Sequence, residues 1–147
     1  MSKVFFNYDD RVLSINHKRK IRSFIASLFS LEKKELLRID YIFCSDDNLL
    51  KINRSFLKHD FYTDIITFDL SEPKTGIKGE VYISVDRVKE NAVALKMGFE
   101  EEILRVLFHG ALHLCGYTDK RTKNILVMRQ KEDHYIKLYK NHIKRST

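Results

Sequence analysis

Hydrophobic residues along this 147-residue chain recur with two different periods, and each period predicts its own kind of element. Short apolar segments rich in β-branched and aromatic residues predict strands over residues 3–7, 36–44, 63–70 and 79–85. Apolar residues at helical spacing predict helices over residues 17–29, 46–57, 86–97, 101–115 and 122–143, the first starting at Asn16 or His17. Strands and helices that partly alternate are typical of a mixed sheet with helices packed against it.

Polar and glycine residues mark the ends of several of these elements. Ser45 followed by Asp46 is an N-cap signal, and Gly98 is expected to end the helix over residues 86–97. The last helix is predicted to bury one apolar side, formed by Ile125, Leu126, Met128, Tyr135, Leu138 and Tyr139. Because no repeat, low-complexity tract or linker interrupts the chain, we predict a single α+β domain over residues 1–147. It has a four-stranded, mostly mixed sheet and about five helices.

The composition fits a protein that forms its core without disulfides. Hydrophobic residues make up 44% of the chain and there is one proline. Cys44 and Cys115 each lie in an apolar run, so we interpret them as reduced, buried cysteines of a cytoplasmic protein. There is no apolar run of about 18 residues and no signal peptide, so we expect a soluble protein that does not insert into a membrane.

The charge balance favours a polyanionic partner. The net charge is +7, from 27 Lys and Arg against 20 Asp and Glu, and nucleic acid is the first partner to consider. Four of these cations, Lys18, Arg19, Lys20 and Arg22, cluster in the first predicted helix, where the simpler interpretation is a solvated helix face.

Residues 109–119, with the sequence HGALHLCGYTD, have the spacing of a metal site. His109 and His113 lie four residues apart in a predicted helix, about 40° apart around its axis, so both imidazoles can reach one ion. Gly116 suits a left-handed helix C-cap, and Asp119 then returns a carboxylate from a new direction. Three ligands with the fourth position open is the arrangement of catalytic zinc.

Two features of this segment leave other interpretations open. The spacing resembles that of metzincin proteases with Asp in place of the last His, but Gly110 occupies the position of their catalytic Glu. A histidine pair at this spacing also occurs as ordinary core or surface residues. Cys115 is an alternative ligand, although it should face away from His113.

Four motifs in order resemble the YbeY family of bacterial metal-dependent endoribonucleases, also called rRNA maturation factors. They are Leu50-x-x-Asn53 with Asp60-x-x-Thr63-Asp64-Ile65-Ile66-Thr67-Phe68, then residues 79–84 (GEVYIS), Glu102-Ile103, and residues 109–119. The resemblance covers about residues 35–135. It implies a zincin-like metal helix and cleavage of precursor rRNA at the small ribosomal subunit, with no DNA substrate.

The resemblance also shows two departures that bear on the site. The family's third metal ligand is a histidine, and its position here is Asp119, an oxygen donor that also serves zinc. We therefore expect His109, His113 and Asp119 to hold one divalent ion, Zn²⁺ with Ni²⁺ or Mn²⁺ as alternatives. The family's arginine falls on Leu57, so we predict that Arg54, three residues earlier, supplies the guanidinium; an ordinary surface arginine is the alternative.

Hydrolysis needs a group that accepts a proton from the attacking oxygen. The metal helix offers no obvious residue for this role, since Gly110 stands where the proteases have their catalytic Glu. We predict that His59 lines the cleft and takes part in catalysis with Arg54, while Asp64 and Glu102 are candidates by position only. Three functions are considered: a metal-dependent endoribonuclease of rRNA maturation and ribosome quality control, a ribosome-associated RNA-binding factor with a structural metal, and a zinc metalloprotease-like hydrolase. Gly110 and the basic charge count against the last.

Overall fold

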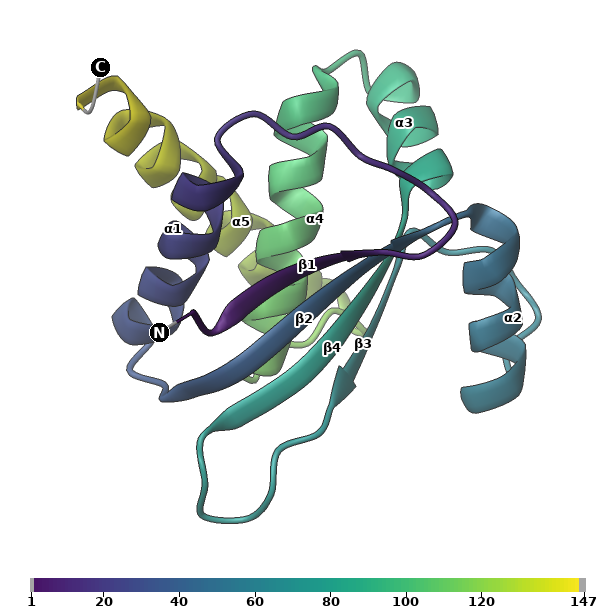
Figure 1. Ribbon diagram of the computed structural model, residues 1–147, viewed down its shortest axis with the longest axis horizontal. Coiled ribbons are helices and arrows are strands. Elements are labelled where there is room, and N and C mark those ends of the chain that lie inside the picture. Colours follow the sequence, from purple (N-terminus) through teal and green to yellow (C-terminus); the bar gives the residue numbers. More distant parts are fainter. Residues whose placement is uncertain (1, 146–147) are drawn as a thin grey trace.

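The computed structural model describes residues 2–145 as a four-stranded sheet with five helices, which confirms the predicted α+β class (Figure 1). In chain order the elements are β1 (Val4–Tyr8), α1 (Lys18–Leu31), β2 (Leu36–Cys44), α2 (Asp46–Phe56), β3 (Ile65–Asp69), β4 (Ile77–Ser84), α3 (Val85–Ala94), α4 (Phe99–Leu114) and α5 (Thr122–Arg145). The N-cap predicted at Ser45 is confirmed, because its side chain accepts a hydrogen bond from the Asn48 amide at 3.1 Å.

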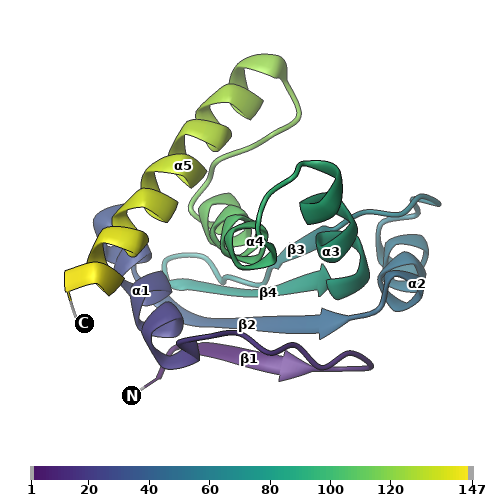
Figure 2. The same cartoon turned by 90° about the horizontal axis from the view of Figure 1, so that it is seen from above.

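The sheet is mixed, in the order β1-β2-β4-β3. β1 and β4 both run parallel to β2. β3 runs antiparallel to β4 and is an edge strand of the sheet. Parallel neighbours need a crossover. The first crossover is α1, and the second contains α2 and β3. Figure 2 shows α1, α3, α4 and α5 on one side of the sheet, with α2 at the end where β2 finishes.

The alternation of side chains along each strand divides the core into two parts. Ile65 packs against the main cluster under α4, whereas its neighbour Ile66 joins a small cluster with Cys44 and Leu49 under α2. The first two residues of β3 are therefore packed on both faces of the sheet. This packing holds the start of β3 in place where the chain leaves the α2–β3 link.

α4 is the helix around which the main core is built. It contacts α5, α3 and β3, and its side chains Ile103, Leu107, Phe108 and Leu112 are at most 1% exposed. Tyr41 of β2 is fully buried beneath it and donates a hydrogen bond from its hydroxyl to the Leu107 carbonyl at 2.8 Å. Each such side chain contributes about 1.5–3 kcal/mol when removed from water. Any group that α4 carries is consequently held on a rigid support.

Two predictions at helix boundaries and faces were wrong. Gly98 does not end α3: the helix stops at Ala94, the left-handed residue is Lys96 (φ 53°), and Gly98 instead forms the N-cap of α4. On α5, Met128, Tyr135 and Tyr139 are buried as predicted, but Ile125, Leu126 and Leu138 are exposed. The first turns of α5 project beyond the body of the domain (Figure 2), which leaves Ile125 and Leu126 exposed while Met128 still packs on the main core.

Both cysteines are free and buried, as predicted. Burial raises the pKa of each thiol, Cys44 and Cys115, to about 12. Within residues 2–145, no helix combines the length and the apolar character needed to cross a bilayer.

Candidate metal centre

The two histidines of the predicted metal segment stand one turn apart on α4. Their rings are nearly parallel, with an interplanar angle of 9° and centroids 6.4 Å apart, so both point to the same side of the helix. Because α4 is fixed by the core, the two imidazoles have a defined position relative to each other.

The helix ends as the sequence predicted. Gly116 has φ 111°, its amide donates to the His113 carbonyl at 3.0 Å, and the Tyr117 amide donates to the Leu112 carbonyl at 3.1 Å. This pair of bonds is the Schellman C-cap, which reverses the direction of the chain. The returning loop brings Asp119 Oδ2 to 3.2 Å from His109 Nε2.

Each histidine is oriented through its other ring nitrogen. His109 Nδ1 lies 2.6 Å from Glu132 Oε2, and His113 Nδ1 lies 2.9 Å from the Tyr117 carbonyl oxygen. Since a carboxylate and a carbonyl only accept hydrogen bonds, both Nδ1 atoms donate, and in the neutral imidazoles both Nε2 atoms carry the lone pair. Metal-ligating histidines are held in this way by their outer partners.

The charges around His109 favour a cation at this place. Burial alone would lower the pKa of His109, but the hydrogen bond and charge of Glu132, together with Asp119, outweigh it and raise the pKa. The carboxylates that stabilise the protonated imidazole would also attract a divalent ion bound at Nε2 of His109. The donor set therefore fits a zinc-type ion by its chemistry.

The three predicted ligands are not all brought together in the structure. Across residues 2–145, no three His, Cys, Asp or Glu side chains are placed so that they could hold one ion. His109 and Asp119 are in contact, while His113 stands one turn away. Closing the site requires a side-chain movement, and Asp119, which is 43% exposed on its loop, has the freedom to make it.

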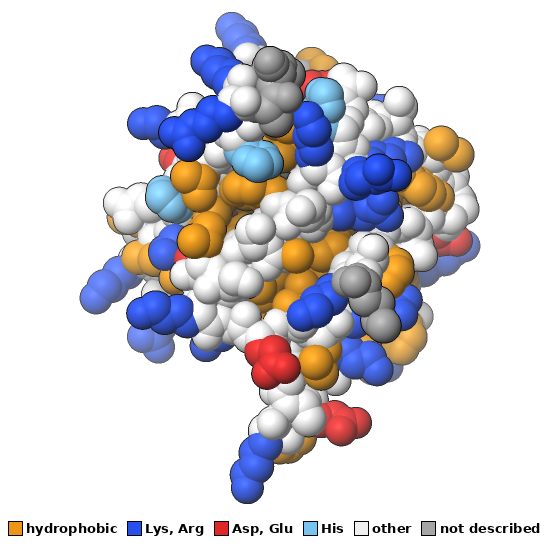
Figure 3. All heavy atoms as spheres, turned by 60° about the vertical axis from the view of Figure 1, so that its left-hand side comes forward, with side chains coloured by type: hydrophobic (Ala, Val, Ile, Leu, Met, Phe, Trp, Pro, Cys, Tyr) orange, Lys and Arg blue, Asp and Glu red, His pale blue; other side chains and the backbone are white. Residues whose placement is uncertain are grey.

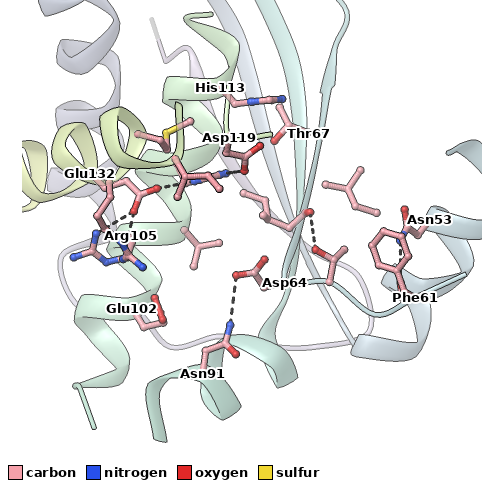
Figure 4. Close-up of a pocket in the computed structure, with 18 of the residues that line it drawn as sticks. Asn53, Phe61, Asp64, Thr67, Asn91, Glu102, Arg105, His113, Asp119 and Glu132 are labelled. Carbon is pink, nitrogen blue, oxygen red and sulfur yellow. Dashed lines mark hydrogen bonds and ion pairs between the residues drawn. The ribbon is translucent and has the colours of Figure 1, made fainter. Parts of the chain in front are cut away.

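The histidines and Asp119 open into a cleft of about 590 Å³ between α4, β3, α3, the first half of α5, the end of α2 and the link from α2 to β3. Figure 4 shows its labelled polar side chains converging from these elements. Asp64 and Glu102, which the sequence offered by position only, both line it. Burial is the main cause that raises the pKa of each carboxyl group, and Asn91 donates a hydrogen bond to Asp64 at 3.4 Å.

The two residues predicted to be catalytic lie differently. His59 lines the cleft, but Arg54 is absent from its lining and is ion-paired with Asp60 on the surface. Leu57, at the position of the family's arginine, does line the cleft.

The guanidinium groups of the cleft belong instead to Arg105 of α4 and Arg129 of α5. Arg105 donates to Glu132 at 3.0 Å and to Asp133 at 2.7 Å, and its Nε is buried with no partner within the described residues. Sequence reasoning missed both arginines and Glu132. For Arg105 a signal existed, since it precedes His109 by four residues, the same spacing that separates the two histidines.

The structure explains why no protease-type base follows His109. A Cβ on Gly110 would lie 2.8 Å from Val81 Cγ1 and 3.1 Å from its Cγ2, because α4 packs directly on the sheet at this residue. Contacts this short are not tolerated, so a glutamate has no room there.

Comparison with known proteins gives consistent matches along the chain. A family described as Endoribonuclease YbeY matches residues 5–140. Curated relatives named Endoribonuclease YbeY include one from Cytophaga hutchinsonii, 47% identical over 93% of this chain and 96% of the relative. Another, from Flavobacterium psychrophilum, is 43% identical over 97% and 99%. The solution structure of a Thermotoga maritima protein is similar with a TM-score of 0.61 and 28% identity, covering 96% of this chain and 93% of that one.

Proposed function

This chain belongs to the YbeY family of endoribonucleases, and on that premise we propose that it is a metal-dependent endoribonuclease that matures rRNA precursors at the small ribosomal subunit. The observation that carries the proposal is the orientation of His109 and His113. Both Nδ1 atoms are engaged by protein acceptors, which leaves the Nε2 atoms to bind an ion from one side of a rigid helix, and the group that His109 Nε2 now contacts is Asp119, the third assigned ligand.

We assign the ion to His109, His113 and Asp119, with Glu132 and the Tyr117 carbonyl as the outer partners of the histidines. When bound, a divalent ion polarises the phosphoryl group and lowers the pKa of a coordinated water towards 7. Zn²⁺ fits two imidazoles and one carboxylate. The oxygen donor Asp119 also makes the site harder than a three-histidine site, which is why Ni²⁺ and Mn²⁺ belong in the test.

Cationic side chains of the cleft bind the phosphate in this proposal. Arg129, whose side chain is 54% exposed at the rim, can turn its guanidinium to a phosphate in bidentate fashion. Arg105 is held by Glu132 and Asp133 and keeps a fixed positive charge behind the metal ligands. His59 lies in the lining and can contact the substrate there, and Arg54 positions the loop of His59 through its ion pair with Asp60.

A proton must also leave the attacking oxygen during the reaction. Asp64 is the proposed acceptor, because it lines the cleft and burial raises its pKa, which makes the carboxylate a better base. Glu102 lies in the same lining and is the second candidate. The Gly110 position takes no part, since it carries no side chain and faces Val81.

Metal content and RNA cleavage, measured together, test this proposal. We expect about one zinc or similar ion per parent chain by elemental analysis, and loss of both metal and RNA cleavage in His113→Ala and Asp119→Ala. Asp69→Ala, an exposed aspartate outside the cleft, is the control and should keep both. Metal without RNA cleavage, in a folded protein that binds ribosomes, would favour the RNA-binding factor instead. Arg129→Ala should lower RNA cleavage without lowering metal content. Its effect on cleavage should be larger than that of Arg54→Ala.

A further inference from the structure

A second groove lies on the other edge of the sheet from the metal centre. It has a volume of about 710 Å³ and runs between α1, β1 and the start of β2. The strand order places β1 and β3 at opposite edges, and β3 lines the metal cleft. With strands about 4.8 Å apart, the groove and the cleft are separated by at least the width of the sheet.

Basic side chains border this groove. They are Lys3, Arg19, Arg22 and Lys34, and its one carboxylate is Glu35. Within the described residues none of these four cations forms an ion pair, and Arg22 contacts only the ring of Phe6, at 6.0 Å. Figure 3 looks onto this side of the molecule, where Lys and Arg are frequent and acidic side chains are few.

In the part of the chain that the structure describes, six of the ten arginines of this protein are paired with a carboxylate, whereas the two that border the groove are not. Arg11, Arg38, Arg54, Arg87, Arg105 and Arg129 each lie within 4.0 Å of a carboxylate. Four arginines lack such a partner in residues 2–145, namely Arg19, Arg22, Arg121 and Arg145; Arg19 and Arg22 border the groove, and Arg121 directly precedes α5. Arg145 borders a neighbouring hollow that shares Ser23 and Ser27 with it. Like charges three residues apart on a helix destabilise it slightly, so the cluster is not explained by the stability of α1.

The floor of the groove suits a phosphate chain. Ser23, Ser27 and Ser30 follow Arg19 and Arg22 on one side of α1, so hydroxyl donors and small side chains extend about 16 Å along the helix beside the guanidinium groups. Arginine and serine are common donors to phosphate oxygens. No tyrosine, phenylalanine or histidine is among the described residues that line the groove, so it offers no aromatic ring on which a base could stack.

We propose that this α1 groove, formed by Lys3, Arg19, Arg22 and Lys34 with the serines of α1, binds the phosphate backbone of RNA independently of its sequence. It serves as a docking site that holds a large RNA while another part of that RNA occupies the metal cleft. The docking role rests on the proposed endoribonuclease function, whereas RNA binding by the groove does not.

A variant with a matched control tests the groove. In Arg19→Gln/Arg22→Gln/Lys34→Gln three charges are removed from the net +7, and Lys51→Gln/Lys74→Gln/Lys89→Gln removes three from exposed positions outside the groove and the cleft. The probes are an in vitro transcript of folded small-subunit rRNA and a single-stranded RNA of about four nucleotides, which spans about 14 Å at roughly 3.4 Å per nucleotide and is chosen to occupy one site only. Melting curves check that each variant is folded. If Arg22→Gln lowers the melting temperature, the double variant Arg19→Gln/Lys34→Gln replaces the triple variant in the binding assay.

For the groove variant we expect affinity for the transcript to fall at least about tenfold near physiological salt. The slope of log K against log salt should become shallower by about 0.7–0.9 for each phosphate that the protein no longer neutralises. Cleavage of the short RNA and metal content should stay at the parent level, and the lysine control should differ little from the parent. If the parent cuts neither RNA, the proposed function fails while the binding assay still judges the groove. Equal binding of the transcript by both variants would overturn the inference, as would parent binding to vesicles of phosphatidylglycerol with none to RNA.

Discussion

Replacing Glu132 by glutamine tests how the metal centre is oriented. Glu132 is 5% exposed, and its two oxygens serve two donors: Oε1 accepts from Arg105 Nη1 at 3.0 Å and Oε2 from His109 Nδ1 at 2.6 Å. An amide of the same shape has a single acceptor oxygen. If that oxygen faces Arg105, the amide NH₂ faces Nδ1, and the neutral imidazole must carry its proton on Nε2, the atom assigned to the metal. If it faces His109 instead, two donors meet in a buried place, which costs about 1–3 kcal/mol.

The expected effect on the metal can be sized from this arrangement. Loss of an outer partner of a ligating histidine lowers metal affinity about 10–100-fold. At 1.36 kcal/mol for each factor of ten, this corresponds to about 1.4–2.7 kcal/mol. The assay is competition for zinc against a chromophoric chelator, with cleavage of the short RNA measured on the same samples.

The control for this variant is Asp133→Asn. Asp133 is the other partner of Arg105, at 2.7 Å, but it does not contact His109. Its replacement should leave zinc affinity within about twofold, since the outer partners of both histidines remain. Parent-level zinc affinity in folded Glu132→Gln would refute the assignment of Glu132 as the residue that fixes His109. A loss of equal size in both variants would show that Arg105, and not the His109 hydrogen bond, determines the affinity.

Three further predictions concern the supports of the site. Gly116→Ala should lower the free energy of unfolding by about 1–2 kcal/mol in chemical denaturation, because φ 111° is strained for any L-residue. Gly98→Ala, with open space around it and φ −65°, should change it by less than about 1 kcal/mol, because the poorer N-cap and the lower entropy of the unfolded chain act in opposite directions; equal losses in both would contradict a backbone cause at Gly116. Burial opposes the charge of Glu32, but hydrogen bonds from Tyr117, Tyr135 and Lys131 prevail and lower its pKa below the ordinary 4.5. Its stabilisation is therefore present above about pH 4.5 and is lost as the pH falls through the lower folded pKa. The gap in unfolding free energy between parent and Glu32→Gln should shrink over that range, and a gap that stays constant down to pH 3 would contradict this. Finally, Cys44 and Cys115, with pKa values raised to about 12 by burial, should resist a thiol reagent at pH 8 until denaturant is added; rapid labelling of the native protein would contradict the burial of both.

Local patterns predicted the elements well where burial and periodicity agree. The strand over residues 36–44 has the same bounds in the structure, because β2 is central and its Ile39, Tyr41 and Phe43 are buried in the main core, while Cys44 joins the smaller cluster. The predictions that Gly98 ends α3 and that the start of α5 buries its apolar side were wrong for reasons that lie outside the local sequence. A glycine can serve either end of a helix. The apolar side of Ile125 and Leu126 would be buried only if another element reached it.

In the candidate site, too, features that depend on local spacing were predicted, and features that depend on contacts between elements were missed. His109, His113 and Gly116 were found because helical spacing and a C-cap are local properties of one segment. Glu132 lies 23 residues after His109 and meets it only because α5 packs against α4. Arg54 was chosen for its place on α2, but of that helix Asn53 lines the cleft, whereas Arg54 forms an ion pair with Asp60 outside it. Contacts between elements of this kind are not contained in the spacing of residues.

The distribution of charge connects the cleft with the groove on α1. Around the metal centre four carboxylates, Asp64, Glu102, Asp119 and Glu132, stand against the arginines Arg105 and Arg129. Even with a divalent ion bound, such a cleft offers a polyanion little net attraction, because its positive charges are already balanced. The excess positive charge of the protein therefore lies outside the cleft lining, and part of it is formed by the unpaired cations along α1. Attraction between unpaired cations and phosphates releases counterions and weakens steeply with salt, and the few phosphate contacts made inside the cleft add little to that dependence. It follows that salt should inhibit cleavage of a folded transcript much more than cleavage of a short oligonucleotide, and that neutralising the α1 groove should remove most of that difference.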